Sequence, residues 1–373
     1  MIPCLTWAEV DLKAIRANLI AIRALVGSRV KIMAVVKANA YSHGLIEVGR
    51  TVAEAGADQL AVATLNEAVL LRESGLKLPI LVLGTGIPGD GVKEAVRYDI
   101  AQALCTVELA NALSKAAQQL GKPAQAHLKI DTGMGRIGVR VDEAVSFMEQ
   151  IAGLPGLQFT GIFSHFAAAD EGDEEYTNLQ QKRFQKVLDN LERHGYTFPL
   201  RHLANSAGIL DYPEAYFDMV RPGCIIYGCW PSPDNKKIIP LALTLTLKTR
   251  IVYIKKVAAG TPISYGLTYT APSERTLATL PIGYADGYKR ALSNTGYVLI
   301  RGRRCPIVGR VCMDQCVVDV TGVPDVSLGD EVVLIGSQGN NIITPADLAK
   351  LAGTMDLEIL CNISARVPRV YID

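Results

Sequence analysis

Between about residue 30 and about residue 230, eight short apolar runs alternate with amphipathic segments. This alternation predicts parallel strands joined by right-handed helical crossovers. Eight such repeats in about 200 residues fit a TIM-type (β/α)₈ barrel better than an open, doubly wound sheet. No G-x-G-x-x-G motif follows the first run, which weakens the dinucleotide-binding alternative. The predicted strands are residues 31–37, 59–64, 79–84, 101–106, 125–131, 159–165, 200–205 and 219–227.

The segments between these strands carry apolar residues at three- and four-residue spacing and charges elsewhere, as amphipathic helices do. Glycines follow several of them, as is common at helix C-termini. The predicted helices are residues 47–54, 67–73, 108–119, 141–151 and 179–193.

The pattern changes after about residue 235, where residues 231–237 form a polar, proline-marked connection. The runs beyond it are rich in β-formers and have short glycine-bearing turns, which predicts a mostly antiparallel β domain. Residues 344–353 instead predict a helix, capped by Thr344 and closed by Gly353. We expect a barrel over residues 1–235 and a β domain over residues 236–373, with residues 1–10 adding a strand to the second. The predicted β runs are residues 241–255, 276–283, 297–300, 306–308, 315–320 and 331–335.

Composition excludes several classes of function. The chain has 373 residues with 38 Lys plus Arg and 37 Asp plus Glu, a formal net charge of +1, so no nucleic-acid partner is expected. No apolar stretch approaches the roughly 18 residues of a membrane span, and no secretory signal is visible, so we expect a cytoplasmic protein without a membrane partner. The eight cysteines are scattered without zinc-site spacing, which predicts that most are buried thiols and that there is no metal.

Polar side chains occur at the ends of several predicted barrel strands, where such barrels build their active sites. Each of these side chains also has a purely structural interpretation. The alternatives are a solvated strand end for Lys37, a structural histidine for His165, part of a helix cap for Ser206 and a strand-end charge for Arg221. The occurrence of all four at strand ends favours a functional site. A desolvated lysine forms Schiff bases, and the loops after strands seven and eight commonly bind phosphate. Together with the arginine, these features predict pyridoxal phosphate.

The fifth predicted strand also carries several polar side chains. Strand alternation places His127, Lys129 and Asp131 on one face, and Arg136 follows in the next loop. An internal ion pair between Lys129 and Asp131 is the structural alternative.

Five motifs carry a resemblance to the bacterial alanine racemase family, over essentially the whole chain. They are AVVKANAYSHG (34–44), LKIDTGMGR (128–136), SYG (264–266), PIGYADG (281–287) and VGRVCMDQ (308–315). The resemblance implies a fold-type III enzyme with a (β/α)₈ barrel and a C-terminal β domain. It also implies pyridoxal 5′-phosphate as cofactor, interconversion of L- and D-alanine, and a homodimer with shared active sites.

The resemblance implies that Lys37 holds the cofactor and is one catalytic acid/base, with Tyr265 of the other subunit on the opposite face of the substrate Cα. Racemisation needs one group to remove Hα and another to return a proton from the other side. A tyrosine with a pKa near 10 is a poor base at neutral pH unless its surroundings shift that pKa. From the residues alone, Tyr265 would be interpreted as a turn tyrosine.

Further roles follow from the same resemblance. Arg136 and Met313 would bind the substrate, and members often carry a carbamylated lysine at the Lys129 position. The cofactor would be held by Lys37, Tyr41, Arg136, His165, Ser206, Arg221, Gly223 and Cys224. Residues matching the substrate entryway are Asp170, Tyr284, Arg290 and Arg310.

One position departs from the family pattern. The family usually has a tyrosine near the phosphate and the substrate where this chain has Ala365. We expect a larger pocket, one lost phosphate contact, and activity on serine or other small amino acids beyond alanine.

Two alternatives remain at this point. One is a pyridoxal-phosphate-dependent decarboxylase on the same barrel, although Arg221 stands where such enzymes use an acidic group. The other is a non-catalytic cofactor carrier, which would resemble the barrel alone. The sequence leaves cell-wall D-alanine supply and D-amino-acid catabolism equally open.

Overall fold

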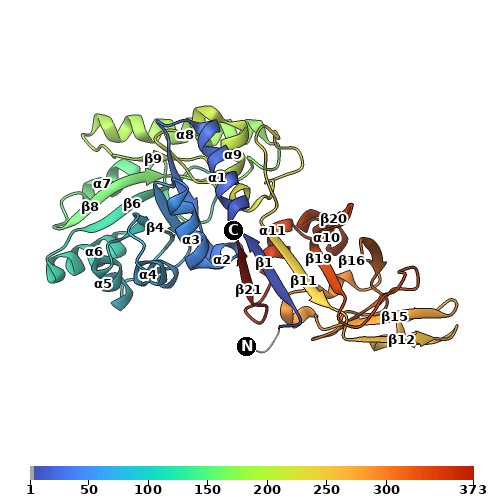
Figure 1. Cartoon of the computed structure of the whole chain (residues 1–373). Coiled ribbons are helices and arrows are strands. Elements are labelled where there is room, and N and C mark those ends of the chain that lie inside the picture. Colours follow the sequence, from blue (N-terminus) through green and yellow to red (C-terminus); the bar gives the residue numbers. More distant parts are fainter. Residues whose placement is uncertain (1–3) are drawn as a thin grey trace. The chain divides into compact units, whose positions relative to one another are not determined.

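The computed structural model describes residues 4–373 and divides the chain into two compact units (Figure 1). The barrel unit comprises Ile15–Ala40 and Leu45–Ala242. The β unit comprises the residues up to Ala14, Tyr41–Gly44 and Leu243–Asp373. The chain therefore passes into the β unit after Ala242, later than the predicted boundary at residue 235.

Eight parallel strands form the centre of the barrel unit, in the order β10-β2-β3-β4-β5-β6-β8-β9. Backbone hydrogen bonds from Asp218 N to Arg201 O and from Arg221 N to Ala204 O join the two ends of this series, so the barrel is nearly closed. The predicted (β/α)₈ architecture is confirmed. The strands are β2 (Lys31–Val35), β3 (Gln59–Val62), β4 (Ile80–Thr85), β5 (Ile100–Leu104), β6 (Ala124–Asp131), β8 (Leu157–Phe163), β9 (Arg201–His202) and β10 (Met219–Val220).

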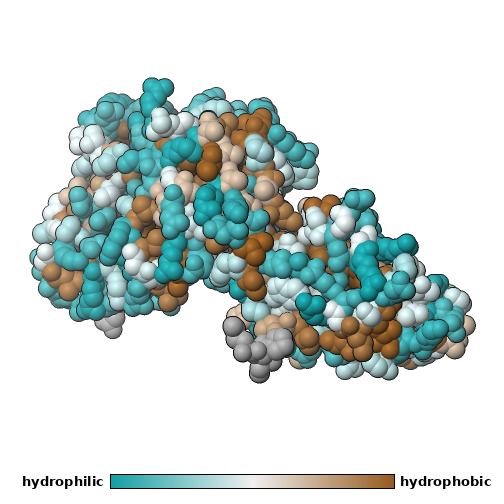
Figure 2. All heavy atoms as spheres, viewed as in Figure 1, coloured by the Kyte–Doolittle hydropathy of each residue, from teal (hydrophilic) through white to brown (hydrophobic). Residues whose placement is uncertain are grey.

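Helices lie outside these strands, as Figure 1 shows. In α8 the buried residues Phe184, Val187, Leu188 and Leu191 repeat at three- and four-residue spacing, so one face packs on the barrel. On the face drawn in Figure 2, hydrophilic side chains predominate over the outer helices. Three of these helices, α1, α5 and α9, were not among the predicted ranges. The helices are α1 (Leu12–Val26), α3 (Leu45–Glu54), α4 (Leu65–Glu73), α5 (Asp90–Arg97), α6 (Val107–Leu120), α7 (Ala144–Ile151), α8 (Glu174–Arg193) and α9 (Ser206–Asp211).

The β unit is built on a sheet in the order β17-β16-β19-β11-β1-β21, with β20 pairing β19, and a three-stranded sheet β12-β15-β18. Its β1 (Trp7–Asp11) pairs antiparallel with β11 and parallel with β21. The first three residues of the predicted segment 1–10 lie outside the described residues. The other strands are β11 (Leu245–Arg250), β12 (Tyr253–Val257), β13 (Pro262–Ile263), β14 (Tyr269–Thr270), β15 (Arg275–Leu280), β16 (Tyr297–Ile300), β17 (Arg303–Pro306), β18 (Cys316–Asp319), β19 (Glu331–Gln338), β20 (Asn341–Ile343) and β21 (Arg369–Ile372).

The predicted C-terminal helix is confirmed as α10 (Pro345–Ala352). Thr344 Oγ1 accepts a hydrogen bond from Asp347 N, and the Asp347 carboxylate accepts one from Thr344 N, which completes a capping box. Gly353 ends the helix in the left-handed region, with φ of 67°. The second helix of the unit, α11 (Asp356–Cys361), was not predicted.

Several predicted strands differ from the structure. The seventh, predicted at residues 200–205, is only Arg201–His202, and the run predicted at 306–308 corresponds to β17, which ends at Pro306. The first ends at Val35 instead of residue 37. The last ends at Val220, because Pro222 has no N–H to donate, and the chain continues into a 3₁₀ turn, Cys224–Tyr227. The run at 241–255 is two strands, β11 and β12, which lie in different sheets. Within residues 4–373, no helix is both long and apolar enough to cross a bilayer.

Candidate active site

Lys37 opens a short left-handed turn, α2 (Lys37–Tyr41), close behind strand β2. Ala38, Asn39 and Ala40 have φ of 55°, 54° and 53°, and the positive φ continues at Tyr41. Left-handed backbone costs about 1–2 kcal/mol for each residue with a Cβ. Backbone held in this region is concentrated at functional sites. The prediction that Lys37 ends the strand is therefore corrected: it begins a strained turn, and its side chain is half-buried.

Three hydrogen bonds hold this turn within the barrel unit. Glu67 Oε1 accepts from Ala38 N at 2.6 Å, Asn39 Oδ1 accepts from Leu45 N at 2.8 Å, and Val36 O accepts from Ala40 N at 2.9 Å. Glu67 also completes the capping box of α4. The start of α4 is thus tied to the residue that follows Lys37.

The end of the same segment is fixed inside the β unit. His43 Nδ1 donates to Tyr41 O at 2.9 Å, so its Nε2 accepts from Thr244 Oγ1 at 2.8 Å. Ser42 Oγ donates to Cys361 O at 3.1 Å. Tyr41, one of the predicted phosphate ligands, is buried.

Arg221 lies buried in the barrel and has only neutral partners among the described residues. Its guanidinium lies 2.9 Å from His202 Nδ1 and 3.1 Å from His165 Nδ1, and it donates to the carbonyls of Ser164 and Leu203. Burial lowers the pKa of Arg221 to about 9, which still leaves it charged at neutral pH. The predicted neighbours Arg221 and His165 are therefore in contact.

The histidines behind Arg221 have defined tautomers. An arginine only donates, so His202 Nδ1 accepts, and its Nε2–H donates to His127 Nδ1 at 2.9 Å. Burial and Arg221 lower the pKa of His127 to about 3, and burial first, then Arg221, lowers that of His202. His127 fits there because its partner in β8 is Gly161, where a Cβ would come within 2.6 Å of the imidazole.

Lys129 is buried in the barrel unit with its Nζ 4.6 Å from the centre of the Phe163 ring. Burial, followed by Arg221 and Arg136, lowers the pKa of Lys129 well below its ordinary value, although Asp131 acts in the opposite direction. The structural alternative of a Lys129–Asp131 ion pair is not observed: Asp131 accepts hydrogen bonds from the backbone of the following glycine loop. Burial therefore favours the neutral form of Lys129.

The two loops after strands seven and eight meet. Ser206 Oγ accepts a hydrogen bond from Gly223 N at 2.9 Å, while Asn205 caps α9 by accepting from Gly208 N at 3.0 Å. The cap interpretation thus applies to Asn205, and Ser206 faces the glycine loop. Cys224, buried, follows directly at the start of the 3₁₀ turn.

A cavity of about 680 Å³ in the β unit brings together the other predicted residues. Tyr265 and Met313 are 73% and 53% exposed. Ser264 Oγ, which precedes the tyrosine, donates to Arg310 O at 2.7 Å. The cavity is lined by Tyr265, Tyr284, Arg290, Arg310, Val311, Cys312, Met313, Asp314 and Gln315.

Three predicted positions lie outside these groups. Arg136 is exposed in the glycine loop after β6. Asp170 is half-buried in the loop before α8 of the barrel unit. Ala365 is exposed in the turn between α11 and β21, next to Arg366, which pairs with Asp314 at 2.8 Å.

The chain matches the family model of the alanine racemase N-terminal domain over residues 10–231 and that of the C-terminal domain over residues 244–371. The chain belongs to the alanine racemase family. A relative named alanine racemase from Halothermothrix orenii is 50% identical over 366 residues, covering 98% of this chain and 96% of the relative. The solved alanine racemase of Clostridium difficile 630 has a TM-score of 0.95 at 40% identity, covering 100% and 97% of the two chains. A solved histidine racemase of Leuconostoc mesenteroides subsp. sake has a TM-score of 0.91 at 31% identity, covering 100% and 99%.

The alanine racemase family depends on pyridoxal phosphate, and the charges of the barrel unit suit such an anionic group. Besides burial, four cations lower the pKa of His165: Arg221, Lys129, Arg136 and Lys37. Among the described residues that affect the pKa of Lys129, Asp131 is the one carboxylate. Two of the four cations, Arg221 and Lys129, are buried, and such a cluster favours an anion, which a phosphate ester with a ring oxygen supplies. The residues present therefore fit the cofactor.

Membership of the alanine racemase family in both domains disfavours the decarboxylase and carrier alternatives. Two supporting residues, Glu67 and His202, were not predicted. Glu67 was interpreted only as a helix start. His202 lies on β9, which pairs with β8, and His165 closely follows the end of β8, so two histidines on neighbouring predicted strands were the available signal.

Proposed function

We propose that this chain interconverts L- and D-alanine with pyridoxal 5′-phosphate, through proton transfers by Lys37 and Tyr265 on opposite faces of the substrate Cα. The observation that carries the proposal is the match to both alanine racemase domains together with a lysine on a strained turn after the first barrel strand. A decarboxylase or a carrier would not need the tyrosine of the β unit.

The bound cofactor supplies an electron sink for the carbanion at Cα. The Lys37 amine removes or returns the proton on one face, and the Tyr265 hydroxyl does so on the other. Arg221, with His165 beside it, would bind the pyridine nitrogen, and because Arg221 keeps its proton it would leave that nitrogen unprotonated. This limits charge withdrawal into the ring and so discourages transamination.

The remaining side chains are proposed to bind and orient the cofactor and the substrate. Arg136 would bind the ring oxygen and the substrate carboxylate, and the backbone N–H of Met313 would bind the same carboxylate. Asp170, Tyr284, Arg290 and Arg310 would line the substrate entryway. Tyr41, Ser206 and the backbone of Gly223 and Cys224 would hold the phosphate.

Circular dichroism of L-alanine tests the activity directly. With the purified chain and pyridoxal phosphate, the ellipticity should decay to zero, and the same end point should be reached from D-alanine. Constant ellipticity, or release of carbon dioxide in its place, would overturn the proposal.

A homodimer with shared sites explains the exposure of the β unit cavity. Tyr265, Leu267, Met313 and Tyr284 are large side chains exposed by 73%, 65%, 53% and 43%. Apolar groups gathered on one surface mark interaction sites. A second copy would cover them and bring Tyr265 to the lysine of the partner.

Mixing two inactive variants tests this shared site. Lys37→Ala and Tyr265→Phe homodimers should each be inactive, whereas a heterodimer of the two holds one intact site and one doubly altered site. Co-expression with two affinity tags should therefore recover about half of the wild-type activity per heterodimer. If the isolated heterodimer has no more activity than its parents, each site belongs to a single chain.

Lys129 is suited to carbamylation. The neutral amine attacks carbon dioxide, and the carbamic acid then loses a proton, which leaves an anion beside Arg136. Burial favours the neutral amine because it lowers the pKa of Lys129 well below its ordinary value. Growth with ¹³C-bicarbonate should give a carbamate carbonyl signal in NMR that Lys129→Ala removes. Lys115→Ala, which changes an exposed lysine of α6, should keep the signal. The same signal in Lys129→Ala would contradict this assignment.

Ala365 is expected to broaden the substrate range. With no tyrosine ring at this position, kcat/KM for L-serine should lie within a thousandfold of the value for L-alanine. Ala365→Tyr should reduce serine relative to alanine by about 10–200-fold, the usual effect of a small change in pocket volume. A wild-type serine value a thousandfold or more below alanine would contradict the expectation, as would an unchanged ratio in the variant.

We place the enzyme in the cytoplasm. Its eight cysteines form no disulfide in the structure, as suits a reducing compartment. The location is compatible with both D-alanine supply and D-amino-acid catabolism.

A further inference from the structure

A second cavity in the β unit is lined by arginines and shares no lining residue with the cavity of Tyr265. It measures about 540 Å³ and lies where the start of β15, strand β17 and the turn after β18 meet. Arg275, Arg303 and Arg304 line it, and Asp319 is the one carboxylate among its lining residues. We call it the arginine cavity.

Arg303 and Arg304 are held in place by uncharged partners. Arg303 donates to Gly322 O at 3.0 Å, and the Arg304 guanidinium lies 4.7 Å from the centre of the Tyr297 ring. These partners fix position but carry no negative charge. The cavity therefore keeps a positive charge from two preorganised guanidinium groups.

Arg275 shows the clearest sign of a missing partner. Its Nε is buried and has no hydrogen-bond partner among the described residues. It forms an ion pair with Asp319 Oδ2 at 3.6 Å, which is too far for a hydrogen bond, while Asp319 Oδ1 accepts from Thr321 N and Thr321 Oγ1. Buried polar groups in folded proteins are normally paired, so an external acceptor is expected here.

Covalent chemistry is not expected at this place. Cys305 also lines the cavity, but burial and Asp319 raise the pKa of its thiol to about 11. The thiolate, which is the reactive form, is then scarce at neutral pH. The cavity is a binding site and not a reaction site.

We propose that the arginine cavity binds a small molecule that carries a pyrophosphate group. Arginine forks match phosphate oxygens bidentately, and three of them suit a group with several anionic oxygens. The volume exceeds what a single phosphate fills and lies in the range of small-molecule sites. The site is independent of the proposed racemase chemistry, because none of its residues takes part in it.

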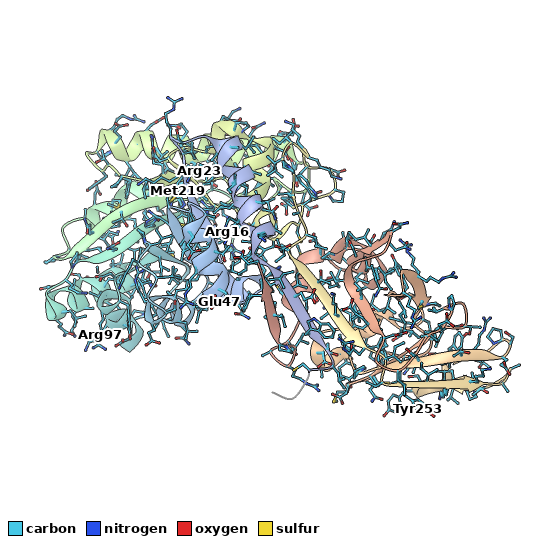
Figure 3. All side chains as sticks on the ribbon, in the orientation of Figure 1. Arg16, Arg23, Glu47, Arg97, Met219 and Tyr253 are labelled. Carbon is cyan, nitrogen blue, oxygen red and sulfur yellow. The ribbon has the colours of Figure 1, made fainter. Side chains whose placement is uncertain are left out.

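Calorimetric titration of the cofactor-loaded full chain with inorganic pyrophosphate tests the proposal, since loading keeps the phosphate site of the cofactor occupied. One pyrophosphate should bind per chain. Arg303→Gln and Arg275→Gln should each weaken binding at least about tenfold, as loss of a charge-assisted bidentate contact does. Arg97→Gln removes the same charge from an exposed arginine of α5, visible in Figure 3, and should leave binding unchanged.

Additional variants and ligands distinguish the possible outcomes of the titration. Thermal unfolding should be alike in all variants, and Arg303→Lys, which keeps the charge but loses the fork, should also weaken binding. ADP should bind like pyrophosphate. The proposal is overturned by equal binding in the arginine variants and in Arg97→Gln, by binding of ADP alone, or by no saturable binding. Pyrophosphate that separates two copies in sedimentation would also overturn it, since an acidic segment of a second chain would then occupy the cavity.

Discussion

Replacing Lys37 with alanine is expected to lower kcat/KM for L-alanine by at least about 10⁴-fold. One general acid/base group contributes about 10²–10⁴-fold, and Lys37 is proposed to hold the cofactor as well, so both losses combine. The variant should also lose the visible absorbance of the lysine-bound cofactor. The measurement is a racemisation assay with an absorbance scan of the dialysed protein.

Lys31→Ala is the matched control, because Lys31 is an exposed lysine at the start of the same strand, β2. It should retain both the absorbance and the activity. Activity of Lys37→Ala above about one-hundredth of wild type would contradict the role given to Lys37.

Tyr265→Phe removes a single hydroxyl and is expected to lower kcat for racemisation by about 10²–10⁴-fold. The side chain is 73% exposed in the chain, so the temperature of unfolding should stay unchanged. Tyr253→Phe, at an exposed tyrosine of β12 labelled in Figure 3, should change neither quantity. If the two variants have equal kcat values, the hydroxyl of Tyr265 takes no part in proton transfer.

The barrel strands and the helix α10 could be predicted because their signals are local. Apolar periodicity specifies which face is buried, and Thr344, Pro345 and Gly353 mark the two ends of a helix within ten residues. The run at 241–255 was predicted as one strand because its β-forming pattern continues across the break at Ile251, where the two strands enter different sheets.

The geometry around Lys37 could not be predicted from the same signals. The left-handed turn is held by Glu67, 29 residues after Ala38 in the chain, and no local propensity favours it at alanine. The buried series Arg221–His202–His127 likewise joins residues 19 and 75 positions apart. Tyr265 emerged only through the family resemblance, because a turn tyrosine carries no signal of its own.

The two-face mechanism is tested most directly by hydrogen exchange at Cα. Tyr265→Phe, loaded with cofactor, is incubated in D₂O separately with L-alanine and with D-alanine, and loss of Hα is followed by proton NMR. The account predicts that exchange persists for only one enantiomer, the one whose Hα faces Lys37, while racemisation is lost from both sides. Wild type should exchange both. Equal loss of exchange for the two enantiomers, or racemisation at the wild-type rate, would contradict the assignment of Lys37 and Tyr265 to opposite faces.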